Sequence, residues 1–483
     1  MTEPREPGGG APVRHVSRTP GAAARFIAGL SWADLPAEVI GKAKLCFADT
    51  LAAAIAGRVT RSSAIAAGLS ASWWPAGEAH LLVDGARVAG VGAAFANAVA
   101  ANAVDIDDCG IYTWGHPGAQ VVPAALALAE QEHLDGHGLL TAIVVGYEVA
   151  FRAGRCLNFE LTKVAAAERR FRACGSWGSL ACAAIACSAR GLDAETASQA
   201  LGIAEYHSPD LPMMRDVDSP AMVKHGVGMG ALTGILAADL AARGFTGIVP
   251  SLELDEFADF VADLGSFYLL PRGITWKRYS SCAWTHPALL AVEALVTRHH
   301  FAAADVAHVL IETYPDAVRL GTRLPLTTEE AQFNLAWPVA ALLVDGEVGP
   351  RQVLEERLDE PSIREMAGRI EVRVSDELSR LYYLSEANDP AGKDAAGVTV
   401  TLRDGRVVSS GPVEHVLYPE PSWDAAEMRA KFVWLTQPHL RPAARDRITD
   451  LVETVDEVAD VREFTEELCA ALLPVQSSRK GKA

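Results

Sequence analysis

A series of alanine-rich apolar segments with helical spacing does most to limit what this chain can fold into. Between about Ala22 and Leu269, apolar residues recur every three to four positions, the period of an α-helix, and glycines close several of the segments. The segments that fit best are residues 42–58, 90–104, 121–132, 138–154, 176–191 and 230–244. Half of the 483 residues are hydrophobic, and alanine side chains are small enough to let helices pack closely. We therefore expect a large all-helical domain with a sizeable core.

Two local features of these helices can be predicted. Pro123 is expected in the first turn of the segment 121–132, where its missing N–H costs no hydrogen bond. Glu148 and Arg152 lie four positions apart, on one face of the segment 138–154. Side chains with this spacing are neighbours on a helix, so we expect the two to form an ion pair.

The pattern changes after about Pro271. Runs of β-branched residues become frequent, and Asp404-Gly405 stands between two of them, which predicts a hairpin turn. The strand-like segments are residues 306–314, 369–374 and 397–411, and the helical ones are residues 285–301 and 329–346. The second of these helices is expected to kink or begin near Pro338. Residues 271–412 are therefore predicted to form a smaller α+β domain.

The two ends of the chain differ from each other. Helical spacing returns in residues 422–436, 441–455 and 460–473, and Ser422 is the expected N-cap of the first of these helices. Residues 1–21 are instead rich in Pro, Gly and Arg and lack the apolar core of a signal peptide. We expect them to be a mobile leader.

Charge and cysteine content exclude several classes of function. The net charge of −18 argues against nucleic acid as a partner, because phosphate backbones bind basic surfaces. No CxxC pair occurs among the eight cysteines, so neither a zinc nor an iron–sulfur motif is indicated, and free thiols in the reducing cytoplasm are expected. No charge-free apolar run reaches about 18 residues, so no membrane span is predicted.

The segment 104–118, VDIDDCGIYTWGHPG, gathers Asp105, Asp107, Asp108 and His116 within a dozen residues. It could be a metal site, an acid–base pair or a polar loop before a helix. The spacing does not fit a calcium loop, whereas magnesium stays open. Asp105 ends an apolar helix, so we expect burial to raise its pKa and suit it to proton transfer.

Lys224 lies beside a glycine-rich stretch, Gly226-x-Gly228-x-x-Ala231. The spacing matches a dinucleotide-binding loop, but no strand precedes it, as such a loop requires. We instead expect a tight turn around Lys224 at the start of a helix, where backbone N–H groups favour a carboxylate or phosphate. The alternative is a solvated lysine in a flexible turn.

Two further groups of polar residues lie next to predicted helices. Lys277, Cys282 and His286 occur just before or at the start of the segment 285–301, where the helix dipole would favour a neutral imidazole. Arg172 ends a basic run before the segment 176–191, and its planar guanidinium suits carboxylates. A lysine with its amine at the surface and a solvated basic loop are the respective alternatives.

Six sequence blocks in one order tie these features together. They are residues 104–130, 146–154, 173–186, 222–247, 276–288 and 331–348. On these blocks the chain resembles the MmgE/PrpD family, which includes 2-methylcitrate dehydratases and cis-aconitate decarboxylases, from about Ala22 to Leu473.

The resemblance implies a mainly α fold with an α+β part. Residues 22–270 and 413–483 would form one large all-α helical domain, into which residues 271–412 are inserted as a smaller α+β lid domain. A homodimer is also implied, with a substrate cleft between the two domains of each chain. Neither a metal nor an organic cofactor is implied.

The resemblance also implies the site residues. Asp105, His116, Lys224 and Lys277 match catalytic positions of the family, and His286 lies in the matching lid helix. The substrate-binding positions are Thr113, near the family's site threonine, together with Arg172 and Cys282. The chain departs from relatives at two places, where Arg172 replaces a histidine and Ala283 an arginine.

The function implied is that of a cofactor-independent lyase acting on a small anionic polycarboxylate. Dehydration of a 2-methylcitrate-like hydroxy acid is the main expectation, with Asp105 and His116 as acid and base and Lys224, Lys277 and Arg172 holding carboxylates. Decarboxylation of a cis-aconitate-like acid and epimerisation of an amino or imino dicarboxylate are alternatives. A tricarboxylate-binding protein without catalytic activity is an alternative of another class.

Overall fold

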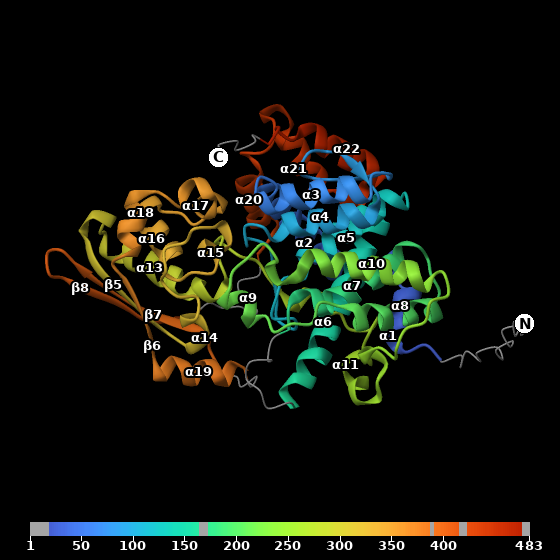
Figure 1. The fold of residues 1–483 in the computed structure, drawn as a ribbon, viewed down its shortest axis with the longest axis horizontal. Helices are drawn as coiled ribbons and strands as arrows, with labels where there is room; N and C mark the ends of the chain where they lie inside the picture. Colours follow the sequence, from blue (N-terminus) through green and yellow to red (C-terminus); the bar gives the residue numbers. More distant parts are fainter. Residues whose placement is uncertain (1–18, 164–171, 387–390, 415–422, 476–483) are drawn as a thin grey trace, which may run out of the picture.

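Helices dominate the computed structural model, which describes residues 19–163, 172–386, 391–414 and 423–475. The first part of the chain forms α1 (Ala22–Gly29), α2 (Ala37–Gly57), α3 (Arg61–Trp73), α4 (Gly90–Asn102), α5 (Gly118–Gln131), α6 (Gly136–Lys163), α7 (Cys174–Ala189), α8 (Ala194–His207), α9 (Met214–Asp218), α10 (Val227–Ala241), α11 (Ala258–Val261) and α12 (Leu270–Gly273). These helices lie together on one side of the molecule (Figure 1). The predicted helical part of the fold is thus confirmed.

Small residues let these helices approach one another closely. Helix α7 packs against both α6 and α10, and α4 packs against α5. A Cβ atom added at Gly234 of α10 would lie 2.4 Å from the carbonyl oxygen of Ser179 in α7. Only glycine fits this crossing, which explains why the buried segments are so rich in small residues.

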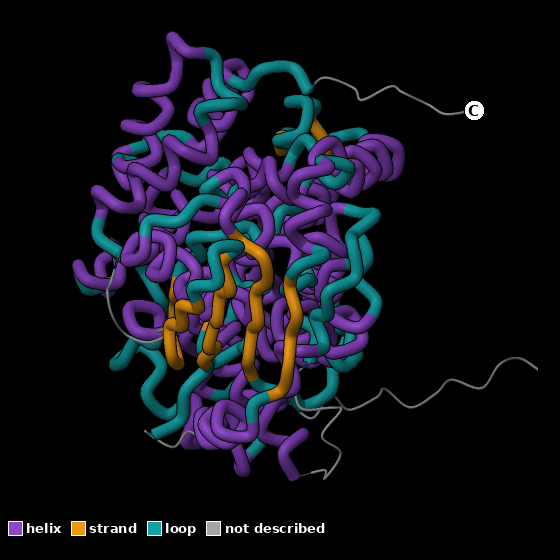
Figure 2. Tube along the Cα trace, turned by 90° about the vertical axis from the view of Figure 1, so that its left-hand side faces the viewer, coloured by secondary structure: helices purple, strands orange, loops and turns teal. Residues whose placement is uncertain are grey.

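A four-stranded mixed sheet follows in the order β6–β5–β7–β8 (Figure 2). Its strands are β5 (Val306–Thr313), β6 (Ile370–Val374), β7 (Ala395–Leu402) and β8 (Val407–Glu414). Strand β5 pairs parallel with β6 and antiparallel with β7, which pairs antiparallel with β8. Gly405 has φ 90° in the turn between β7 and β8, so the predicted hairpin is confirmed.

Helices accompany this sheet. They are α13 (His286–His299), α14 (Pro315–Val318), α15 (Thr328–Gln332), α16 (Ala336–Asp345), α17 (Pro350–Val353), α18 (Pro361–Ala367) and α19 (Asp376–Glu386). Helix α13 packs on β7 and β8. The predicted helix 329–346 is two helices, the second of which begins at Ala336 and holds Pro338 in its first turn. The α+β part is thus present, whereas its role as a lid stays a prediction.

The chain then returns to the first helices. Helices α20 (Ala425–Thr436), α21 (Arg445–Glu453) and α22 (Val461–Ala471) complete the described fold. Both α20 and α21 pack against α2, and α22 packs against α5, so these red helices lie beside the blue helix α2 (Figure 1). None of the described helices has the length and apolar character needed to cross a membrane.

Two local predictions were wrong. Helix α5 begins at Gly118, which places Pro123 inside the helix and not in its first turn. The carboxylate of Asp108 accepts a hydrogen bond from the Gly118 N–H at 2.9 Å, and this contact starts the helix early. Ser422 lies outside the described residues, and the N-cap of α20 is Asp424, whose carboxylate accepts from the Glu427 N–H.

A short antiparallel ribbon connects two distant segments that carry predicted site residues. It joins β3 (Cys109–Gly110) to β4 (Ile274–Thr275), with Cys109 opposite Thr275. The loop after α4 is thereby held against the segment that leads into Lys277.

Candidate active site

Four of the predicted residues meet in one buried cluster. Asp105 follows α4, His116 precedes α5, Lys224 precedes α10 and Lys277 follows β4. The ribbon of β3 and β4 and the packing of α10 against α4 and α5 bring them together. Each of the four is at most 6 % exposed, so any charge in the cluster is largely removed from water.

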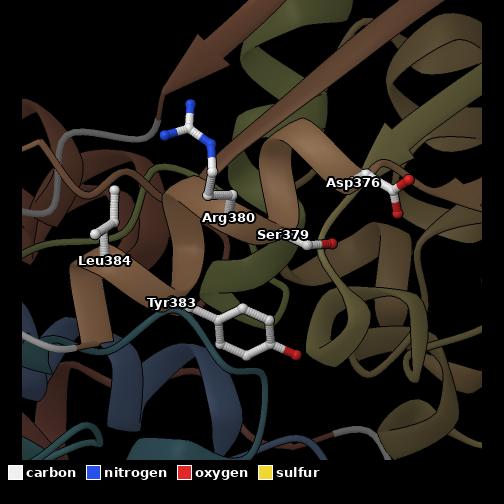
Figure 3. A pocket seen from close by; sticks show the side chains of 5 residues that line it. All are labelled: Asp376, Ser379, Arg380, Tyr383 and Leu384. Atoms are coloured by element: carbon white, nitrogen blue, oxygen red, sulfur yellow. The ribbon is translucent and has the colours of Figure 1, made fainter.

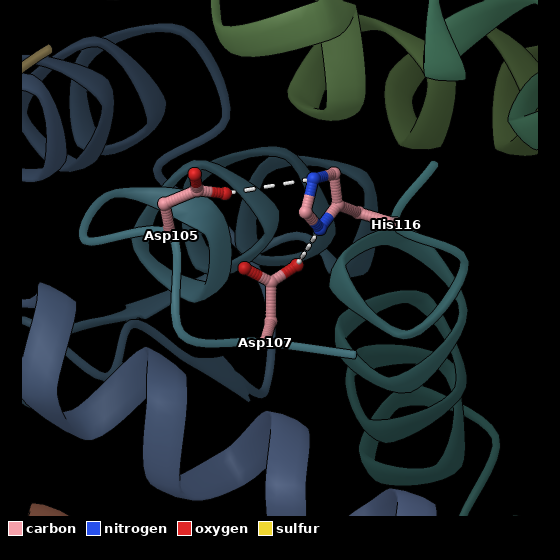
Figure 4. Close-up of side chains that lie close together, drawn as sticks. All are labelled: Asp105, Asp107 and His116. Atoms are coloured by element: carbon pink, nitrogen blue, oxygen red, sulfur yellow. Dashed lines mark ion pairs between the residues drawn. The ribbon is translucent and has the colours of Figure 1, made fainter. Parts of the chain in front are cut away.

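His116 stands between two carboxylates (Figure 4). Its Nε2 lies 3.5 Å from Asp105 Oδ1, and its Nδ1 lies 3.1 Å from Asp107 Oδ2. Nδ1 is also 2.9 Å from the carbonyl oxygen of Asp108. Because a carbonyl only accepts, Nδ1 carries a proton, and Nε2 is the nitrogen that can exchange one.

Asp105 is surrounded by cations. Its Oδ1 lies 2.7 Å from Lys277 Nζ and 3.7 Å from Lys224 Nζ. Burial alone would raise the pKa of Asp105, but the two ammonium groups and His116 outweigh it and hold this pKa well below its usual range. The predicted rise in the Asp105 pKa is therefore wrong, since that prediction considered burial without the cations. Asp105 is a permanent anion at neutral pH.

Lys277 is 1 % exposed, which rules out a lysine with its amine at the surface. Its ammonium donates to the Asp105 carboxylate, to the Asp105 carbonyl oxygen at 3.2 Å and to the Ser281 carbonyl oxygen at 3.1 Å. Burial would lower the pKa of Lys277, but the Asp105 charge raises it above the usual range. Three acceptors use all three ammonium protons, so Lys277 has no proton left over for a ligand.

Lys224 is also buried, and the alternative of a solvated lysine is wrong. It begins a turn in which three successive residues are left-handed, with φ 37° for Lys224, 57° for His225 and 74° for Gly226. Its ammonium donates to Gln332 Oε1 at 2.6 Å and lies 4.9 Å from the centre of the Phe333 ring. With Asp105 at the longer distance of 3.7 Å, Lys224 keeps more capacity for an anionic ligand than Lys277 does.

Sequence reasoning missed several members of the cluster. Asp107, which was not among the predicted site residues, is fully buried and accepts two hydrogen bonds from the Asn102 amide, at 2.9 and 3.1 Å. Gln332 was not singled out, although it lies within one of the six blocks. The alternation of Asp105 and Asp107 could have indicated a second carboxylate, whereas no sequence signal placed Gln332 beside Lys224.

A second imidazole, His225, was also missed. Its ring is parallel to that of His116, with centroids 5.7 Å apart and an interplanar angle of 11°. Nδ1 of His225 lies 3.0 Å from Asp216 Oδ2. Burial lowers the pKa of His225 below its usual value, against the opposing effect of Asp216, and His116 and Lys224 lower it further. His225 is therefore a neutral imidazole at neutral pH.

Cys282 and Thr113 lie in the surroundings of the cluster. The Cys282 N–H donates to the Gln332 carbonyl oxygen at 3.0 Å, and burial raises the pKa of the Cys282 thiol to about 11, so the thiol stays protonated at neutral pH. Thr113 is buried, and its hydroxyl donates to the Gly110 carbonyl oxygen at 3.1 Å. Both are held near the site by contacts with the backbone.

Arg172 and His286 are placed by other contacts. Arg172 pairs with Asp210 at 2.6 Å and is partly exposed, and residues 164–171 before it lie outside the described residues. His286 is fully buried in the first turn of α13, with its ring edge-on to Tyr279 at 5.1 Å. Their predicted roles towards substrate stay predictions.

The cluster also holds the one group of potential metal ligands within the described ranges, namely Asp105, Asp107 and His116, with ligand atoms within 4.8 Å of one another. The Lys277 ammonium already occupies the Asp105 oxygen nearest to it. A divalent cation at this point would face that ammonium and Lys224 without screening by water. The donor set therefore suits proton transfer better than metal binding.

A shallow hollow on α19 is unrelated to this cluster (Figure 3). Its lining residues all belong to one helix, and they are Asp376, Ser379, Arg380, Tyr383 and Leu384. One face of one helix offers few converging polar groups, whereas the buried cluster draws its groups from four segments. The cluster is the better candidate for a catalytic site.

Comparison with known proteins agrees with the six sequence blocks. The family model for the MmgE/PrpD N-terminal domain matches residues 21–263, and that for the MmgE/PrpD C-terminal domain matches residues 279–457. The chain is 28% identical to a cis-aconitate decarboxylase of Homo sapiens over 381 residues, which is 72% of this chain and 75% of the relative. It is 24% identical to a cis-aconitate decarboxylase of Aspergillus terreus over 469 residues, 90% of this chain and 92% of the relative. A cis-aconitate decarboxylase-like protein of Aspergillus oryzae is 24% identical over 474 residues, 91% of this chain and 95% of the relative.

Proposed function

The chain belongs to the MmgE/PrpD family, and from that premise we propose that it is a lyase that removes CO₂ from a cis-aconitate-like tricarboxylate. The relatives that match most of its length carry the name of that reaction, which favours decarboxylation over the dehydration expected from the resemblance alone. Dehydration of a 2-methylcitrate-like acid becomes the second candidate. Both reactions need a cationic pocket and a group that transfers a proton to or from carbon or oxygen.

The observation that carries the proposal is the buried placement of His116 and Lys224 next to the same carboxylate oxygen of Asp105, at 3.5 and 3.7 Å. Lys224 binds one substrate carboxylate through a charge-assisted hydrogen bond. When the bond to another carboxylate breaks, its electron pair stays on the substrate, where the adjacent double bond and a carboxylate delocalise it. A proton from His116 Nε2 then forms the new C–H bond, so that CO₂ leaves and one proton is taken up.

Asp105 and Lys277 support this step without exchanging protons. Asp105 remains anionic and aligns the imidazole and both ammonium groups. Lys277 is fixed by three protein acceptors and neutralises Asp105. The proton transfer is therefore assigned to His116 alone, which departs from an Asp105–His116 acid–base pair. No metal or organic cofactor is needed for these roles.

The proposal is tested by incubating the protein with cis-aconitate, citrate, 2-methylcitrate and iminodisuccinate, with products identified by NMR and mass spectrometry. Decarboxylation lowers the substrate mass by that of CO₂, dehydration lowers it by that of water, and epimerisation leaves it unchanged. We expect CO₂ loss from cis-aconitate. Water loss from 2-methylcitrate without CO₂ release would favour the second candidate. A thermal shift with ligand and no turnover across the panel would favour a binding protein instead.

A further inference from the structure

A third buried lysine, Lys431, comes from the far end of the chain and contacts the loop of residues 103–110, which carries Asp105 and Asp107. It lies on α20 and is 4 % exposed. Its ammonium pairs with Asp49 of α2 and donates to the carbonyl oxygen of Ile106 at 2.9 Å. Ile106 is the residue between Asp105 and Asp107, the two carboxylates that flank His116.

Lys431 is one of three side chains that donate to backbone carbonyl oxygens of residues 103–106. Gln332 Nε2 donates to the Ala103 carbonyl oxygen at 2.9 Å, and Lys277 Nζ donates to that of Asp105 at 3.2 Å. Lys431 Nζ donates to the next carbonyl oxygen along the chain, that of Ile106. The three donors come from α15, from the segment after β4 and from α20, so three distant parts of the fold meet on four residues of backbone.

The conformation of the loop explains why it needs such support. Asp105 has φ 55°, a left-handed conformation that costs a residue other than glycine about 1 kcal/mol or more. That conformation turns the Asp105 carboxylate towards His116 Nε2, while Asp107 meets Nδ1 from the other side. A small rotation at Ile106 would move both carboxylates relative to the imidazole.

The hydrogen-bonding capacity of the Asp49–Lys431 pair is only partly used, so stabilising the fold is a poor explanation for the pair. Asp49 is fully buried, and its Oδ2 has no hydrogen-bond partner among the described residues. Burial raises the pKa of Asp49 to about 6, in spite of the opposing effect of Lys431. A buried ion pair of this kind is weak support for stability, whereas together with the Ile106 contact it connects α2 and α20 to the loop.

We propose that Lys431, held in place by Asp49, is a positioning residue that sets the geometry of Asp105 and Asp107 around His116. The kinetic test of this proposal, by CO₂ release, rests on the proposed function. The structural test, by amide hydrogen exchange, does not depend on that function. Lys431 touches the loop backbone and not the substrate, so it acts on the proton-transfer step through His116. A shift of about 1 Å in such a group can cost about 10²-fold in turnover.

The test compares K431M, whose unbranched side chain is one atom shorter and carries no charge, with K431R and D49N. Arg429→Ala is the matched control, because Arg429 lies on the same helix and forms ion pairs at the surface with Asp450 and Glu453. Each variant is assayed for CO₂ release from cis-aconitate. Amide hydrogen exchange of peptides that cover residues 103–110 is followed by mass spectrometry.

We expect K431M to lower kcat by about 10²-fold with KM changed by less than about threefold, and to speed exchange in residues 103–110. K431R should recover at least part of kcat, and R429A should behave like the wild type.

Wild-type kcat and wild-type exchange in K431M would overturn the proposal. If K431M does not fold, D49N decides, because an unchanged kcat in folded D49N overturns the proposal and a lowered kcat supports it. A wild-type protein without turnover of cis-aconitate counts against the proposed function, and the exchange data then decide the role of Lys431 by themselves.

Discussion

At the scale of single residues, the proposed function assigns proton transfer to one imidazole. His116 carries a proton on Nδ1, which faces the Asp108 carbonyl oxygen, and presents Nε2 to the cluster. We predict that His116→Ala lowers kcat by about 10²–10⁴-fold, the range for loss of a general acid or base, while KM for cis-aconitate changes little. Steady-state assays of CO₂ release measure both constants, with the circular dichroism spectrum as the check on folding. Normal turnover in folded H116A would remove His116 from the mechanism.

Asp107 is predicted to matter although it need not touch the substrate. Its carboxylate lies 3.1 Å from His116 Nδ1, and this contact stabilises the imidazole with its proton on that nitrogen. Asp107→Asn should lower kcat by about 10–10²-fold, because orienting partners of this type are worth about that much. Asp84→Asn, at an exposed position, is the control. Equal kcat values for D107N and the wild type would show that the backbone contact of His116 is sufficient.

The residues of the site differ in how far sequence alone reveals them. Asp105, His116, Lys224 and Lys277 lie in distinctive blocks and meet in one cluster. Lys431 lies in a charged helix segment with no visible motif, and its contact with Ile106 spans 325 positions of the chain. The direction of the Asp105 pKa shift also depends on contacts between distant segments. A neighbouring apolar helix indicates that Asp105 is buried, but the sequence does not show that two lysines lie beside its carboxylate.

At the scale of helices and strands, the spacing of apolar residues predicted most of the long helices, including α5 and α7, which are buried along nearly their whole length. The hairpin of β7 and β8 followed from its turn residues. The ends of the elements were less predictable, since single side-chain hydrogen bonds decide them. Asp108 starts α5 at Gly118, and Asp424 with Glu427 starts α20.

The loop after α20 supplies a prediction on pH and stability. Burial, together with the charge of Arg58, lowers the pKa of His439 from 6.5 to about 4. The folded state therefore disfavours the imidazolium, and the unfolded state binds more protons between pH 4 and 6.5. The contribution of His439 to stability is present above pH 6.5 and is lost as pH falls towards 4, by an amount on the order of 3 kcal/mol.

We predict that His439→Gln flattens this part of the pH dependence. The free energy of unfolding, measured by urea titration at pH 7.5 and pH 4.5, should fall less in H439Q than in the wild type. Other groups titrate in the same range, but they contribute equally to both proteins and cancel in the difference. Parallel curves for the two proteins would contradict the burial of a neutral His439.

At the scale of the whole molecule, the described surface has apolar side chains in regular rows on two helices. Ile65, Leu69 and Trp73 are exposed at intervals of four on α3, so they share one face of that helix. Helix α10 exposes a similar row, made of Met229, Leu236 and Leu240. Both helices pack on α4. Extended rows of exposed apolar residues are typical of protein–protein interfaces.

The resemblance to the MmgE/PrpD family implies a homodimer, and we predict that these two rows form its interface. Light scattering after size exclusion should give twice the chain mass of 51.2 kDa for the wild type. A double variant, Ile65→Glu with Leu236→Glu, should shift the mass to that of one chain, because burying two carboxylates per subunit across a dimer interface costs several kcal/mol.

Val407→Glu is the matched control, since Val407 is as exposed as these residues but lies on β8, away from α3 and α10. A wild-type protein with the mass of one chain would contradict the predicted dimer. A double variant that stays dimeric would show that the subunits meet through another face, and in that case the apolar rows need a different partner.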